Sequence, residues 1–73
     1  MTVTHTMEDL RTLRRAYESV RCAPLDGREA GRALSRADVG SVEAALMHLT
    51  GCSSAHALIE CGKARDVVRA ERH

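Results

Sequence analysis

The chain has 73 residues, enough for one small domain and close to the lower limit for a self-sufficient hydrophobic core. Apolar residues make up 44% of it, but eleven are alanines and Tyr17 is the only aromatic residue, so we expect a thin core and no enclosed substrate cleft. The net charge of +1 provides no overall attraction to nucleic acid, and no apolar run is long enough to span a membrane.

The charges are segregated along the chain. Residues 10–36 contain seven arginines and three acids, whereas residues 37–62 contain three acids and no lysine or arginine. The first half is therefore basic, and the middle is acidic and rich in apolar residues. The three cysteines are an odd number without scaffold spacing, and the N-terminus has no signal-peptide pattern. These features predict a reduced, cytoplasmic protein.

The first helix is predicted over residues 7–22. Thr6 can cap its first backbone N–H groups, Asp9 can reciprocate, and Pro24 cannot continue the helix. Apolar residues recur at three- and four-residue steps and form one buried stripe. The residues of this stripe are Leu10, Leu13, Tyr17 and Val20.

The opposite face of this helix is rich in arginine, with Arg11, Arg14 and Arg15 at its centre. The next helix adds Arg28 and Arg32 one turn apart. Two interpretations remain open for this basic face. It is either a solvated surface or a surface that pairs with an acidic patch on another protein.

The second helix is predicted over residues 27–34, with Asp26 and Glu29 as its starting pair. Its inward stripe is narrow and consists of Ala30, Ala33 and Leu34. The third helix is predicted over residues 36–50, and Gly51 is expected to end it in a left-handed conformation.

The start of the third helix carries the strongest capping pattern in the sequence. Ser35 and Asp38 have capping-box spacing, and Leu34 and Val39 occupy the two positions of a hydrophobic staple. The inward stripe of this helix is predicted to be Val39, Val42, Leu46 and Leu49.

The third helix also has a second apolar stripe on its other side, formed by Gly40, Ala44 and Met47. A helix that is apolar on two sides is either central in its bundle or offers one side to another molecule. Burial against the fourth helix is one interpretation, and a groove for a partner helix is the other.

The fourth helix is predicted to begin at Ser53 or Ser54. Leu58 and Ile59 point in a different direction from Ala64 and Val68, so we expect a kink or a break at Gly62. The whole chain is expected to be all-α, a small bundle of three to four short helices. Its predicted organisation is a flexible N-terminus over residues 1–6, one helical domain over residues 7–68 and a frayed tail over residues 69–73.

A zinc-stabilised module is the weaker of two alternatives. His48, Cys52 and His56 follow one another at one-turn spacing, and Cys61 lies further along the chain. Gly51 is expected to interrupt the shared face, and no paired Cys-x-x-Cys motif is present. We therefore expect no metal and no cofactor. The sequence also contains no nucleotide fingerprint or paired acids, and so we predict no catalytic residue and no enzyme.

Direct DNA binding is the stronger alternative, because the second and third predicted helices could form a helix-turn-helix. The exposed positions of the recognition helix would be Ser41, Glu43 and Ala44, with no cation after Arg36. An acidic recognition helix is repelled by phosphate. Contact with nucleic acid is therefore possible but disfavoured.

Part of the chain resembles a known type of domain. Arg32-Ala33-Leu34, followed by Val42-Glu43-Ala44-Ala45-Leu46 and Leu49, looks like the last two helices of ubiquitin-associated three-helix domains. The N-terminal domain of bacterial elongation factor Ts has the same layout. The resemblance covers about a third of the chain and implies a compact three-helix core. The loop by which the eukaryotic members bind ubiquitin is replaced here by Pro24-Leu25-Asp26-Gly27.

The leading functional hypothesis is a non-enzymatic adaptor or inhibitor of phage or bacterial type. It would dock onto an acidic patch of a larger protein complex, such as the transcription apparatus, as a monomer or a homodimer. The predicted contacts come from the basic face and from two apolar anchors. The candidate binding residues are Arg11, Arg14, Arg15, Arg28, Arg32, Ala44 and Met47.

Overall fold

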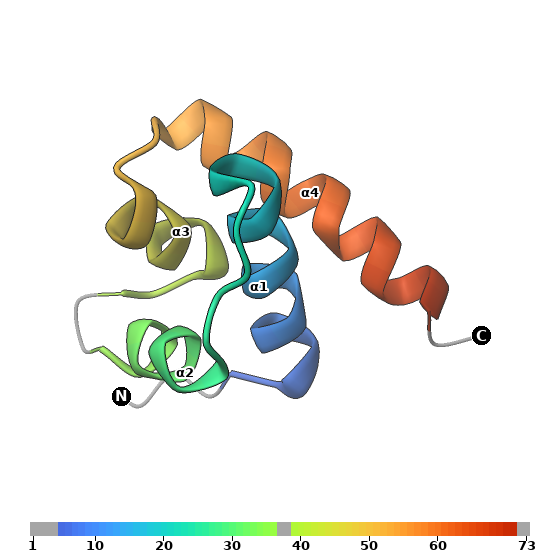
Figure 1. Cartoon of the computed structure of the whole chain (residues 1–73), viewed down its shortest axis with the longest axis horizontal. Helices are drawn as coiled ribbons and strands as arrows, with labels where there is room; N and C mark the ends of the chain where they lie inside the picture. Colours follow the sequence, from blue (N-terminus) through green and yellow to red (C-terminus); the bar gives the residue numbers. More distant parts are fainter. Residues whose placement is uncertain (1–4, 37–38, 72–73) are drawn as a thin grey trace.

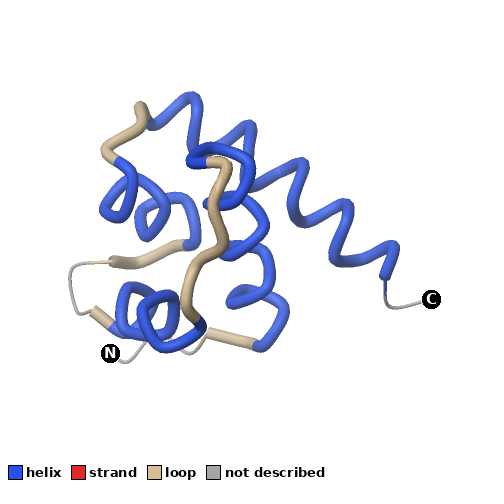
Figure 2. Tube along the Cα trace, viewed as in Figure 1, coloured by secondary structure: helices blue, strands red, loops and turns tan. Residues whose placement is uncertain are grey.

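The structure is a computed structural model, and it describes residues 5–36 and 39–71. Figures 1 and 2 show that these residues form helices joined by short connections, without any strand. The helices are α1 (Met7–Arg21), α2 (Gly27–Ser35), α3 (Val42–Thr50) and α4 (Ser54–Glu71). The predicted all-α class is therefore confirmed.

The predicted capping box begins α1. The backbone N–H of Asp9 donates to Thr6 Oγ1 at 3.2 Å, and the backbone N–H of Thr6 donates to Asp9 Oδ2 at 3.0 Å. The helix ends at Cys22, which adopts a left-handed conformation with φ of 55° and donates its backbone N–H to the Glu18 carbonyl. The predicted span of 7–22 is thus correct to within one residue.

The N-cap of α2 is Asp26, as predicted, and its carboxylate accepts from the backbone N–H of Arg28 at 2.9 Å. The predicted inward stripe of Ala30, Ala33 and Leu34 is buried. Because two of these three side chains are methyl groups, α2 can pack closely against its neighbours.

The predicted start of the third helix is wrong. Ser35 belongs to the last turn of α2, and α3 begins at Val42 after an N-cap at Ser41, whose Oγ accepts from the backbone N–H of Ala44 at 3.1 Å. Val39 lies in the connection and is buried, and its backbone N–H donates to the Arg36 carbonyl at 3.1 Å. Asp38, the other half of the predicted capping box, lies outside the described residues.

The fourth helix continues through Gly62 to Glu71, so the predicted break at this glycine is wrong. Ala57, Cys61, Ala64 and Val68 follow one another at three- and four-residue steps and form its buried line. In the segment after residue 68, Arg69 Nε lies 3.5 Å from Glu8 Oε1, and Glu71 pairs with Arg15; a frayed tail over residues 69–73 stays a prediction. The expectations for residues 1–4 and 72–73 lie outside the described residues.

The helices are arranged around α1 and α3, which pack against each other and against both remaining helices. Among the described residues, α2 and α4 do not touch; they lie on opposite sides of the central pair, as Figure 1 shows. The core is built mainly of alanines with a few larger side chains, of which Leu13 and Leu46 are fully buried. Because α2 and α4 do not touch, their outer sides form two separate surfaces.

Candidate functional site

The three arginines predicted on the first helix line one hollow of about 340 Å³, together with Pro24 and Leu25. Arg14 Nε donates to the Leu25 carbonyl at 3.1 Å, and Arg15 forms an ion pair with Glu71. Arg11 is exposed, and its side chain has no hydrogen bond or ion pair to another described residue. Two of the three predicted binding residues thus have partners within the fold.

The arginines of α2 point away from the core. Arg28 and Arg32 are exposed, and no hydrogen bond or ion pair joins either guanidinium to the rest of the described chain. Arg32 lines a second hollow, of about 520 Å³, between α2 and α3. The arginines of the predicted basic face therefore do not share one hollow, and Arg28 lines neither of the two.

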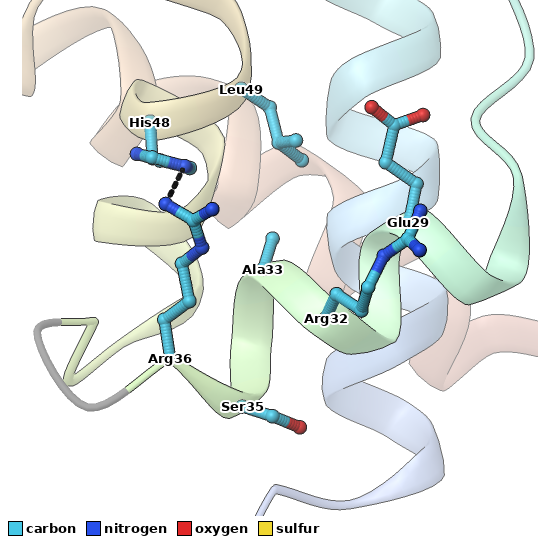
Figure 3. Close-up of a pocket in the computed structure, with 7 residues that line it drawn as sticks. All are labelled: Glu29, Arg32, Ala33, Ser35, Arg36, His48 and Leu49. Atoms are coloured by element: carbon cyan, nitrogen blue, oxygen red, sulfur yellow. Dashed lines mark hydrogen bonds between the residues drawn. The ribbon is translucent and has the colours of Figure 1, made fainter.

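The hollow between α2 and α3 is bridged by one polar contact (Figure 3). Arg36 Nη1 lies 2.8 Å from His48 Nε2, and because a guanidinium can only donate, this imidazole nitrogen accepts. Ala33 and Leu49 form the apolar floor, and Arg32 is turned away from His48, toward the side of Glu29. The lining thus contains two arginines, Arg32 and Arg36, and one acid, Glu29.

The two apolar residues predicted as anchors are only partly accessible. Ala44 and Met47 are half-buried and pack against the core, and Gly40 lies in the connection before α3 rather than on a helical stripe. The second stripe of the third helix therefore does not exist as predicted. Its remaining members contribute mainly to packing.

Two large apolar side chains of α4 are exposed, and neither is among the predicted site residues. Leu58 is 62% exposed and Ile59 is 57% exposed. The sequence did contain a signal for them, because their direction on the helix differs from that of Ala64 and Val68. In the continuous helix α4, this difference in direction leaves both side chains exposed.

The residues proposed for the zinc alternative do not gather. His48 and His56 are exposed, Cys52 is half-buried and Cys61 is fully buried. Within residues 5–36 and 39–71, no group of three or more His, Cys, Asp and Glu side chains could hold a metal ion. Burial, assisted by the nearby charge of Glu43, raises the pKa of the Cys61 thiol to about 11, so this cysteine stays protonated and is a poor nucleophile.

The residues proposed to read DNA are engaged within the fold. Ser41 caps α3, Ala44 is half-buried, and the Glu43 carboxylate forms an ion pair with Arg65 of α4. Burial raises the pKa of Glu43, but its hydrogen bonds, above all that from Arg65, and the Arg65 charge together hold it below the usual value. The start of α3 thus carries a stabilised negative charge and is joined to α4 by this ion pair.

No protein-family model, curated protein or solved structure matches this chain. In the part of the chain that the structure describes, no helix combines the length and the apolar character needed to cross a lipid bilayer.

Proposed function

We propose that this protein is a non-enzymatic regulator that docks onto an acidic patch of a larger protein complex, such as the transcription apparatus. One observation carries the proposal. The guanidinium groups of Arg28 and Arg32 project from the outer face of α2, one turn apart, without a partner among the described residues. The guanidinium of Arg11 on α1 is also exposed and has no partner among the described residues.

Such groups suit recognition because binding does not first require an internal ion pair to break. A guanidinium presents several donors in a plane and pairs with a carboxylate through two hydrogen bonds. Unpaired surface arginines also accelerate encounter with an acidic partner by long-range attraction. Arg14 and Arg15 have a different role, since their contacts with Leu25 and Glu71 hold α1 to neighbouring segments.

The three cysteines are free thiols in this fold. Free thiols are typical of a reducing compartment, which supports our placing this regulator in the cytoplasm.

The test uses two doubly substituted proteins with the same change in net charge. The first carries Arg28→Glu and Arg32→Glu on α2, and the matched control carries Lys63→Glu and Arg69→Glu on α4. Each is tagged and used to capture proteins from the organism that encodes the chain, with quantitative mass spectrometry as the readout. We expect a protein that the wild type and the control retain, that the α2 variant loses, and that high salt releases.

Circular dichroism should show the same helix content for all three proteins, since the substituted side chains are exposed and the two surface ion pairs lost in the control, of Lys63 with Glu60 and of Arg69 with Glu8, contribute little to stability. Capture that is equally strong with the α2 variant would refute docking through this surface. A labelled DNA duplex, titrated in fluorescence anisotropy at low and high salt, provides the competing outcome. Tight binding with a steep salt dependence would instead identify a DNA-binding transcription factor.

A further inference from the structure

An uncharged segment runs through one corner of the molecule. Residues 44–59 contain no Asp, Glu, Lys or Arg, and they form most of α3, the connection after it and the first turns of α4. In a chain with 29% charged residues, a gap of this length leaves one surface without formal charge.

The two acids at the ends of this segment do not restore charge to that surface. Glu43 forms its ion pair with Arg65. Glu60 Oε2 accepts from Ser19 Oγ of α1 at 2.7 Å, and its other oxygen lies 3.4 Å from Lys63 Nζ. Both carboxylates are satisfied by neighbouring side chains, and the surface between them is left neutral.

The exposed part of this surface is one side of α4. Leu58 and Ile59 are its large residues, and helical periodicity places Ala55 and Gly62 beside them on the same side, one turn before and one turn after. We call these four residues the neutral face. Figure 1 shows α4 along one edge of the molecule, so that this face is not covered by α2.

We propose that the neutral face of α4 binds the same face of a second copy of this chain in an antiparallel, two-fold arrangement. The order of the four residues is the same in both directions along the helix: a small residue, two adjacent large residues and a second small residue. Each small residue lies three positions from the nearer large one. A two-fold axis between Leu58 and Ile59 therefore places Leu58 against Ile59 of the other copy. The same axis places Ala55 against Gly62, where small residues allow the two helices to approach closely.

Charge favours a second copy over a foreign partner at this place. An uncharged face meets itself without repulsion, and the fully buried centre of an interface is typically depleted of charged residues. The unpaired arginines named above lie on α1 and α2, and the exposed cations of α4, Lys63 and Arg69, already face Glu60 and Glu8. The exposed Asp66, two turns after Ile59, comes to the N-terminal end of the other α4, where backbone N–H groups favour a carboxylate.

The interface is small, because it consists of one helix face on each copy. Interfaces below about 1,200 Å² in total are typically weak or transient, so we expect a weak, reversible dimer. The association should depend little on salt, because no ion pair contributes to its centre.

Sedimentation equilibrium over a range of concentrations tests the proposal. The wild type should change from a mass of 8.0 kDa to twice that value. Ile59→Asp should weaken dimerisation at least about tenfold, because it places two carboxylates beside the axis. Val67→Asp is the matched control, since Val67 is also an exposed apolar residue of α4, 43% exposed. It lies about 130° around the helix from the neutral face and should leave the dimer unchanged.

A second variant separates association from folding. A Cβ atom added at Gly62 meets nothing within 4 Å, so Gly62→Gln fits the single copy and improves its helix propensity. The longer side chain should nevertheless keep the two helices apart and weaken the dimer. A wild type that remains a monomer at all concentrations would overturn the proposal, as would equal dimerisation of the wild type, Ile59→Asp and Gly62→Gln.

This inference is independent of the proposed function. The α2 variant with Arg28→Glu and Arg32→Glu should dimerise like the wild type, and Ile59→Asp should still capture the acidic partner. Loss of dimerisation in the α2 variant would place the contact on the wrong helix and overturn this inference.

Discussion

The three cysteines have the same side chain but three different environments. Cys22 is exposed at the end of α1, Cys52 is half-buried after α3, and Cys61 is fully buried in the line of α4 that faces the core. Desolvation in this line, followed by the negative charge of Glu43, is what raises the pKa of the Cys61 thiol. The position of each cysteine, rather than its sequence neighbours, therefore decides its chemistry.

We expect a thiol-specific reagent at mildly alkaline pH to modify Cys22 rapidly, and Cys61 only when the protein unfolds. The reason is both the lack of access to Cys61 and its pKa of about 11, which leaves very little thiolate. Mass spectrometry of timed samples would locate the labels. Because the folded-state pKa is raised, the unfolded chain loses this proton first as the pH increases, so stability should decrease from about pH 9 upwards. Equally fast labelling of all three cysteines in the native protein would contradict this account.

The connection between α2 and α3 shows how tertiary burial overrides a local helix signal. The sequence around Ser35 has every element of a capping box, yet Arg36 adopts an extended conformation with ψ of 139°. Val39 is buried although it lies outside a helix, and its backbone N–H donates to the Arg36 carbonyl. Gly40, a poor helix former, and Ser41, a good cap, then place the helix start six residues later than predicted.

The two serines therefore provide a direct test of where α3 begins. Ser41→Ala removes the hydroxyl that accepts from the Ala44 N–H, and should lower the free energy of unfolding by about 1 kcal/mol. Ser35→Ala changes an exposed residue at the end of α2 and should have an effect within about 0.5 kcal/mol. Urea denaturation followed by circular dichroism measures both. The opposite order of the two effects would support the helix start at Ser35.

Sequence reasoning succeeded where a helix is determined by its own residues. The N-terminal starts of α1 and α2 could be predicted from Thr6, Asp9 and Asp26, because a capping side chain contacts a backbone N–H only two or three residues away. It could not foresee that Arg15 would pair with Glu71, fifty-six residues away, since this contact depends on the packing of α4 across α1. For the same reason it identified the exposed arginines without showing which of them are unpaired.

At the scale of the whole molecule, the arrangement separates two kinds of surface. The unpaired arginines of α2 and the neutral face of α4 lie on opposite sides of the central α1 and α3 pair. A partner on α2 and a second copy on α4 could therefore bind at the same time. In that case a weak dimer would bring two arginine surfaces to one acidic complex and strengthen docking through avidity.

The core that supports both surfaces is thin, and this has a measurable consequence. Leu46 of α3 is fully buried, so Leu46→Ala should lower the free energy of unfolding by about 2–5 kcal/mol. This loss is comparable to the whole free energy of unfolding of a domain of this size, roughly 3–5 kcal/mol. Leu58→Ala makes the same chemical change on the neutral face and should leave the stability of dilute protein within about 0.5 kcal/mol. Thermal and urea unfolding of both variants at low concentration would show the difference. We expect Leu46→Ala to be largely unfolded and Leu58→Ala to be folded but weaker in self-association, whereas equal losses of stability would mean that Leu58 belongs to the core.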